Sequence, residues 1–156
     1  MSKKIPLHVA IIPDGNRRWA TSKGLVKTDG YSKVDYEHLE SLIIGAKNLG
    51  VKYMSLWFFS TENWNRPKLE VNFLFNHFSK NVPKLLDGSI KNKVRIKHFG
   101  RKDRLPKEVA NSLEMLESKT KDFQDFTLIL CIDYGGRDEI VRAINKILKS
   151  GASEIS

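Results

Sequence analysis

The segment covering residues 14–20, Asp-Gly-Asn-Arg-Arg-Trp-Ala, combines groups that can bind a phosphate. Its glycine, Gly15, lets the backbone come close to a ligand, and the helix predicted from about Arg17 presents unpaired N–H groups with positive dipole character. Arg17 and Arg18 add charge-assisted donors, whereas Asp14 would repel a phosphate unless a divalent cation such as Mg²⁺ lay between them. The segment therefore indicates a metal–phosphate site. The structural alternative is that Asp14 caps the helix and both arginines face water.

Two further polar segments follow apolar runs. Residues 60–67, Ser-Thr-Glu-Asn-Trp-Asn-Arg-Pro, place a hydroxyl, an amide and a guanidinium directly after such a run. In residues 133–138, Asp-Tyr-Gly-Gly-Arg-Asp, paired glycines permit a tight turn, and Arg137 is either a phosphate donor or an ion-pair partner. Taken alone, each segment is also explained as a turn with a purely structural role.

Other residue types give weaker signals for chemistry. The four histidines lack metal-like spacing, which favours surface or locally hydrogen-bonded positions. The chain has no Walker-type glycine loop and no G-x-G-x-x-G motif, and Ser60 lacks the G-x-S-x-G context of an α/β-hydrolase. Six aromatic residues form either core or the lining of an apolar cleft: Trp57, Phe58, Phe59, Phe73, Phe75 and Phe78.

The elements that must position these groups alternate between apolar, strand-like runs and amphipathic helical patterns. This alternation predicts βαβ units and an α/β fold with a mainly parallel central sheet and flanking helices. Strands are expected at residues 7–12, 51–59, 94–99 and 126–132. Helices are expected from about residue 17, over 34–49 and 71–86 with a bend at Pro83, after Pro106 with an inward face of Val109, Leu113 and Leu116, and over 140–148.

The polar segments leave three of these strands at one end of the predicted sheet. Ligands of open parallel sheets bind beyond the carboxyl ends of the strands, so the three segments should lie together. Residues 60–67 are predicted to be a loop, and the stretch through Gly24 and Gly30 is interpreted as polar connection.

Composition limits the class of protein. The 156 residues, 40% of them hydrophobic, predict one domain over residues 1–156. No apolar run approaches the roughly 18 residues of a membrane span, and the start lacks a signal-peptide pattern, so a cytoplasmic location is expected. Cys131 is the only cysteine, which excludes an internal disulfide and a zinc finger. The net charge of +9 favours anionic partners: nucleic acid, lipid headgroups or phosphorylated small molecules.

Three stretches together carry a specific resemblance to a known family. Residues 8–20, 59–67 and 134–137 resemble the signatures of cis-prenyltransferases, the undecaprenyl diphosphate synthase family, in the same order and spacing. The resemblance covers essentially the whole chain. It implies an undecaprenyl diphosphate synthase-like fold and a Mg²⁺-dependent enzyme, usually a homodimer, that condenses isopentenyl diphosphate onto an allylic diphosphate such as farnesyl diphosphate. Nucleic-acid binding rests only on charge and is not expected.

The resemblance also implies roles for individual residues. Asp14 would engage Mg²⁺ and diphosphate, and Asn63 would assist proton removal from isopentenyl diphosphate. The remaining substrate-binding positions implied in this way are Gly15, Asn16, Arg17, Arg18, Trp19, Ser60, Thr61, Glu62, Trp64 and Arg66, of which residues 60–66 belong to a mobile loop. Lys27 and Tyr31 are counted with them, although the family commonly has an arginine and a histidine there, which leaves weaker diphosphate contacts as an alternative.

The resemblance ends before a C-terminal segment of the family that contributes arginines for isopentenyl diphosphate and much of the dimer interface. The chain is then interpreted as a fragment, a short homologue or a subunit completed by another chain. The alternative function is a non-catalytic prenyl-diphosphate-binding subunit. Membrane contact is expected only for product release, and the large Phe58 is hypothesised to shorten the hydrocarbon tunnel.

Overall fold

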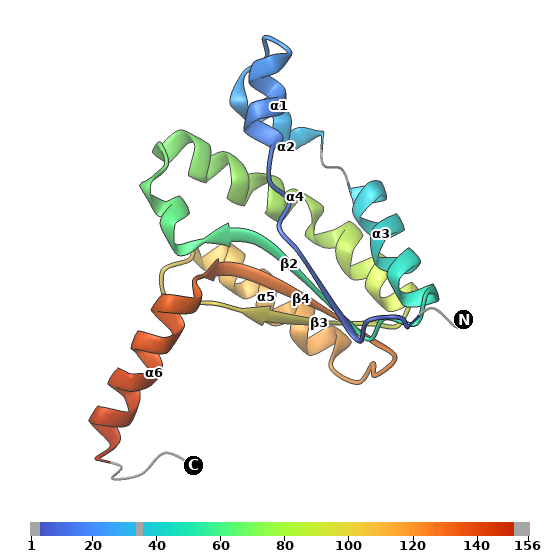
Figure 1. Ribbon diagram of the computed structural model, residues 1–156, viewed down its shortest axis with the longest axis vertical. Helices are drawn as coiled ribbons and strands as arrows, with labels where there is room; N and C mark the ends of the chain where they lie inside the picture. The colour runs from blue at the N-terminus through green and yellow to red at the C-terminus, as the bar shows by residue number, and fades with distance from the viewer. Residues whose placement is uncertain (1–3, 34–35, 152–156) are drawn as a thin grey trace.

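A four-stranded parallel sheet lies at the centre of the structure, a computed structural model that describes residues 4–33 and 36–151 (Figure 1). The strands are β1 (His8–Ile11), β2 (Tyr53–Ser60), β3 (Val94–Phe99) and β4 (Phe126–Tyr134), in the spatial order β1-β2-β4-β3. Every neighbouring pair is parallel, so the predicted α/β class with a mainly parallel sheet is confirmed.

Helices connect the strands in the way that parallel pairing requires. They are α1 (Asn16–Ser22), α2 (Lys27–Ser32), α3 (Tyr36–Asn48), the short 3₁₀ helix η1 (Thr61–Asn65), α4 (Lys68–Lys91), α5 (Lys107–Thr120) and α6 (Gly136–Ser150). In Figure 1, α1 and α2 lie at one end of the molecule and α6 projects from the other.

The hydrophobic core lies between one face of the sheet and the helices α3, α4 and α5. Leu128 and Leu130 of the central strand β4 are completely buried there. From α5, Val109, Leu113 and Leu116 face the core, as the helical spacing predicts. Alternating residues of β2 and β4 point to the opposite face, where Figure 1 shows no helix over the described part of the sheet.

Three expectations about local structure were wrong or incomplete. Residues 27–32, interpreted as a polar connection, form α2, and the predicted loop after β2 contains η1. The helix predicted over residues 71–86 extends in both directions to become α4, which contains Pro83 in its interior. Val34, the predicted start of the preceding helix, lies outside the described residues, and α3 is described from Tyr36.

Candidate functional site

A cavity of about 360 Å³ lies at the carboxyl ends of β1 and β2, between the sheet and the helices α3 and α4. Most of its wall is apolar. Its apolar lining residues are Ile12, Pro13, Leu39, Trp57, Phe58, Phe59, Leu74, Phe75, Phe78, Leu85 and Ile132, and the ring of Tyr36 adds to them. Of the six aromatic residues that sequence left as core or cleft, five therefore line a cleft, and Phe59 and Phe75 are also part of the core. Such a cavity can hold a hydrocarbon chain away from water.

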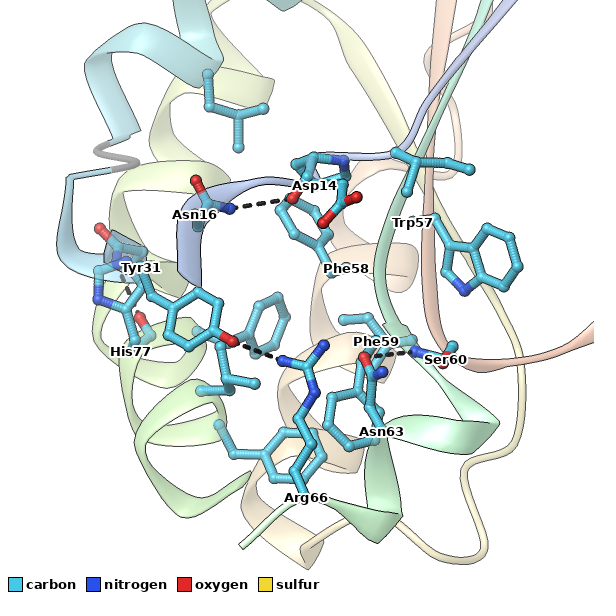
Figure 2. A pocket seen from close by; sticks show the side chains of 18 of the residues that line it. Asp14, Asn16, Tyr31, Trp57, Phe58, Phe59, Ser60, Asn63, Arg66 and His77 are labelled. Atoms are coloured by element: carbon cyan, nitrogen blue, oxygen red, sulfur yellow. Dashed lines mark hydrogen bonds between the residues drawn. The ribbon is translucent and has the colours of Figure 1, made fainter. Parts of the chain in front are cut away.

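Polar side chains gather at one end of this cavity, from three separate parts of the chain. Asp14 and Asn16 come from the β1–α1 connection, Tyr31 comes from α2, and Asn63 and Arg66 come from the segment after β2. Figure 2 shows these five side chains around one opening. The first two polar segments of the sequence therefore do lie together, as the sheet topology predicts.

Asp14 presents an exposed carboxylate at this polar end. Its Oδ1 accepts a hydrogen bond from the Gly15 N–H at 2.6 Å, and its Oδ2 accepts one from Arg18 Nη2 at 3.0 Å. The backbone hydrogen bond from Gly15, followed by the Arg18 guanidinium, lowers the pKa of Asp14 below its ordinary value. Gly15 itself has φ +95°, a left-handed conformation that side chains disfavour. The carboxylate is thus ionised and accessible to a cation.

Arg66 is held at the polar end by a cluster around the buried carboxylate of Glu70. Arg66 Nη1 lies 3.1 Å from Glu70 Oε1 and donates to the Tyr31 hydroxyl at 2.6 Å. The Tyr31 hydroxyl in turn donates to Glu70 Oε1 at 2.7 Å, and Arg17 Nε lies 3.6 Å from the same oxygen. Burial, followed by the hydrogen bond to Glu70, raises the pKa of Tyr31 to about 12, so its hydroxyl stays protonated.

A second, more open depression adjoins the cavity on its cationic side. It is lined by Asp14, Arg17, Arg18, Thr21, Ser22, Lys27 and Arg66. Asp14 and Arg66 line both hollows, so the basic depression and the apolar cavity meet at these two residues. Four cationic side chains facing one carboxylate favour an anionic group with more than one negative charge.

Asn63 and Ser60 are tied to each other at the start of η1. The Ser60 side chain accepts from the backbone N–H of Asn63, and the Asn63 Oδ1 accepts from the Ser60 N–H at 3.2 Å. This capping box fixes both side chains. Because the amide oxygen of Asn63 is used, its amide nitrogen is the group available for a ligand in the cavity.

The third polar segment lies beside the second, as predicted, but it does not line the cavity. It packs behind η1 instead. Gly135 lies so close to Thr61 that an added Cβ would stand 2.4 Å from Thr61 Oγ1. Arg137 acts on the Glu62 carboxylate, whose pKa is lowered mainly by its own backbone N–H and by Ser60. Arg137 lines neither hollow, and its role stays a prediction.

Five residues implied by the resemblance lie outside both hollows, and Gly15 of the β1–α1 connection is one of them. Thr61, Glu62 and Trp64 belong to η1 but are absent from the lining of the cavity, and Trp19 is 41% exposed on α1. The Trp64 ring packs against both Phe59 and Phe75. These residues can support the site, but they do not face it.

The donor set near Asp14 fits a metal ion only together with a ligand. Within residues 4–33 and 36–151, no three His, Cys, Asp or Glu side chains converge as a metal site would require. Mg²⁺ keeps several waters and is commonly held by one or two carboxylates plus substrate phosphates. The single exposed carboxylate of Asp14, beside the basic depression, matches that mode of binding.

Sequence reasoning missed several polar residues of the site: Glu70, His77 and Asn81 on α4, and Tyr36, Thr21 and Ser22, which line the two hollows. Glu70 organises Arg66 and Tyr31, and His77 and Asn81 line the cavity, where Asn81 Nδ2 donates to the His77 carbonyl at 2.8 Å. Glu70 stands four residues after Arg66, a spacing at which opposite charges meet on a helix. That spacing was the available signal. No sequence signal marked His77 and Asn81, because they fall within an otherwise apolar stripe.

Comparison with known proteins gives a consistent result. A family model described as undecaprenyl diphosphate synthase matches residues 12–156. The chain is 44% identical over 156 residues to the isoprenyl transferase of Aquifex pyrophilus, covering 100% of this chain and 67% of that protein. It is 42% identical over 146 residues to the isoprenyl transferase of Thermotoga maritima, covering 94% of this chain and 62% of that protein.

Solved structures agree with the sequence relatives. Lavandulyl diphosphate synthase from Lavandula x intermedia, in complex with dimethylallyl diphosphate, superposes with a TM-score of 0.86 at 30% identity, over 94% of this chain and 64% of that chain. A probable undecaprenyl diphosphate synthase from Campylobacter jejuni gives 0.78 at 29% identity, over 99% and 66%. The chain thus spans about two thirds of the length of the proteins it matches.

Proposed function

Because the chain belongs to the undecaprenyl diphosphate synthase family of cis-prenyltransferases, we propose that it binds an allylic diphosphate in the two adjoining hollows and serves cis-prenyl transfer from isopentenyl diphosphate. One observation supports this most directly: a cavity of about 360 Å³ with an apolar wall opens into a depression lined by arginines and a lysine. A hydrocarbon chain with a diphosphate head has the matching distribution of polarity.

Each part of the proposed site has a task in the transfer. Arg17, Arg18, Lys27 and Arg66 receive the diphosphate, whose negative charge grows as it leaves the allylic carbon, and preorganised cations stabilise that charge. The apolar wall holds the hydrocarbon and excludes water that would otherwise react with the allylic carbon. Asn63, through its amide nitrogen, orients the second substrate, whose proton passes to an oxygen of the departing diphosphate as the new carbon–carbon bond forms.

Mg²⁺ belongs to this proposal as a partner of the diphosphate. Asp14 would hold the ion, which would neutralise charge on the leaving group. The lowered pKa of Asp14 supports this role, because the carboxylate stays charged at neutral pH. Gly15 holds the Asp14 carboxylate through its backbone N–H, and Asn16 lines the cavity beside it. Ser60, Thr61, Glu62 and Trp64 support the loop that carries Asn63 and Arg66.

We further propose that residues 1–156 act as one domain, in the cytoplasm, and within a dimer. Four apolar side chains of α6 support the dimer, because they are half or more exposed: Ile140, Val141, Ile144 and Leu148. A polyprenyl product needs an apolar destination, so peripheral contact with a membrane at product release completes the proposal. In the described part of the chain, no helix has the length and apolar character needed to cross a bilayer.

The test is transfer of labelled isopentenyl diphosphate onto farnesyl diphosphate by the purified chain, with Mg²⁺ or with EDTA. Asp14→Ala should abolish transfer, because it removes the carboxylate that would hold Mg²⁺. The fold should remain intact, since the Asp14 side chain is exposed. Asp122→Ala, an exposed aspartate in the turn before β4, is the matched control and should retain transfer. Binding of farnesyl diphosphate without transfer would favour the non-catalytic binding subunit. Absence of both would contradict the proposal.

A further inference from the structure

Asp133 is a fully buried carboxylate that the proposed chemistry does not use. It is the penultimate residue of β4, has 0% exposure, and adopts a left-handed backbone conformation with φ +52°. It does not line the cavity or the basic depression. Burying a charge and straining the backbone are both unfavourable, so the surrounding contacts must hold this side chain in place.

Two side chains from different segments bind this carboxylate. Trp64 Nε1 of η1 donates to Asp133 Oδ1 at 2.9 Å. Arg104, in the connection between β3 and α5, donates from Nε to Oδ2 at 2.9 Å and from Nη2 to Oδ1. The Arg104 guanidinium also lies 5.9 Å from the centre of the Trp64 ring. The three side chains form a closed cluster, in which each contacts the other two.

Trp64 connects this cluster to the candidate site. It follows Asn63 directly and precedes Arg66 by two residues, and both of these line the cavity. Its ring also packs against Phe59 and Phe75, whose ring centroids lie 5.1 Å and 5.5 Å from that of Trp64. Since both the ring and its N–H are held, the position of Trp64 fixes the course of η1.

We propose that Asp133 is a positioning residue that clamps η1 through Trp64, with Arg104 as its counter-charge, so that Asn63 and Arg66 stand at the polar end of the cavity before the substrate arrives. The inference rests on the proposed function for the identity of the ligand. The clamp itself depends only on the contacts of Asp133. It assigns Trp64 a role as the anchor of the loop rather than as a direct substrate contact.

Hydrogen exchange and ligand affinity test the clamp on the full chain. Asp133→Asn keeps the shape but removes the charge that pairs with Arg104, and Trp64→Phe keeps the ring packing but removes the N–H donor. Each variant should raise amide exchange in residues 60–67 and weaken farnesyl diphosphate binding by about tenfold. The double variant should bind no more weakly than either single variant, because both remove the same anchor.

Asp103→Asn is the matched control, since Asp103 pairs with Arg101 in the same β3–α5 connection but is 64% exposed at its side chain. It should change neither exchange nor affinity. Unchanged exchange over residues 60–67 in both clamp variants would overturn the inference. So would a rise that is equal across β2, β3 and β4, because that would mean general destabilisation. If Asp133→Asn fails to fold, amide exchange over residues 60–67 in Trp64→Phe tests the clamp by itself, because this variant leaves the Asp133–Arg104 pair intact.

The two proposals can fail separately. If the unmodified chain does not bind farnesyl diphosphate at all, the proposed function fails, whereas the exchange of residues 60–67 still reports on the clamp. If the chain binds farnesyl diphosphate but both clamp variants bind it equally well, the proposed function survives and the positioning role of Asp133 is excluded.

Discussion

The most consequential residue of the site is one that carries the same charge as the ligand. Glu70 is 7% exposed, and its carboxylate holds Arg66 and Tyr31 while facing Arg17. A buried carboxylate requires such partners, so the guanidiniums are gathered before a diphosphate binds. A diphosphate that enters the basic depression competes with Glu70 for Arg17 and Arg66. The site is thus preorganised by an internal anion.

Tyr31 provides a prediction on the pH dependence of stability. Its pKa is raised to about 12, so its contribution to stability is complete below pH 10 and is lost as pH rises toward 12. Tyr31→Phe should lower the free energy of unfolding by about 2 kcal/mol at pH 8, because hydrogen bonds to charged groups are lost. Urea unfolding should show that the difference in free energy of unfolding between the unmodified chain and Tyr31→Phe is smaller at pH 11 than at pH 8. Tyr53→Phe, an exposed tyrosine of β2, should show no difference at either pH, and a constant difference for Tyr31→Phe would refute the argument.

Phe58 provides a prediction on the size of the bound hydrocarbon. It lines the cavity, so Phe58→Ala should enlarge the space for the chain and favour longer products and longer primers. The ratio of affinities for geranylgeranyl and farnesyl diphosphate, with product length by mass spectrometry, measures this. Phe123→Ala is the matched control, because Phe123 is a half-buried phenylalanine in the turn before β4, outside the cavity lining. An unchanged ratio in Phe58→Ala would exclude a shortened tunnel.

At the scale of elements, the sequence predicted the helices and strands that a regular apolar pattern marks, and it missed the short helices that depend on tertiary contacts. The strands followed from apolar runs, and β3 was predicted with its observed bounds. By contrast, α2 is six residues long and has a glycine at its fourth position, so no apolar periodicity marked it. It is held by packing against α1. The proximity of Asp14 and Arg66 could be predicted, because both follow strands that end at the same edge of the sheet. The position of Glu70 could not, because it depends on how α4 is oriented.

The packing of α1 against α2 leads to a prediction at Gly30. A Cβ at this buried residue would lie 2.1 Å from the carbonyl oxygen of Asn16, which is backbone and cannot rotate away. Gly30→Ala should therefore separate the two helices and lower the free energy of unfolding by about 1–3 kcal/mol. It should also weaken diphosphate binding, since Arg17 and Lys27 lie on these helices.

The matched control for Gly30 is Gly45→Ala on α3. Gly45 has nothing within 4 Å of an added Cβ and lies inside a helix, so alanine should raise the free energy of unfolding by about 0.5–1 kcal/mol. Urea unfolding and farnesyl diphosphate titration distinguish the two sites. Equal stability of the two alanine variants would mean that α1 and α2 are free to shift apart.

At the scale of the whole molecule, the helices that enclose the core pack on one face of the sheet, and on the other face Ile129 and Cys131 of the inner strand β4 are buried while outer positions are not. Parallel sheets are normally covered on both faces, yet Tyr53 and Phe99 on the other face are 43% and 45% exposed. Beside this face, α6 projects with its apolar stripe, which consists of Ile140, Val141, Ile144 and Leu148. The α6 stripe is one of several exposed apolar regions of the described chain, and it is distinguished by having four such side chains on one helix.

The charge pattern of α6 indicates which partner suits the apolar stripe. Its first turn carries Asp138 and Glu139, and its last turn carries Lys149. Two copies of α6 packed in antiparallel orientation would place the acidic turn of each beside the basic turn of the other, around the shared stripe.

We therefore predict a dimer in which Ile144 and Leu148 are central. Ile144→Glu and Leu148→Glu should each convert the dimer to a monomer in sedimentation velocity, because a buried charge would be left without a partner. Asn145→Glu introduces the same charge on α6 outside the stripe and should remain dimeric, and an unmodified chain that sediments as a monomer at every concentration would exclude this pairing.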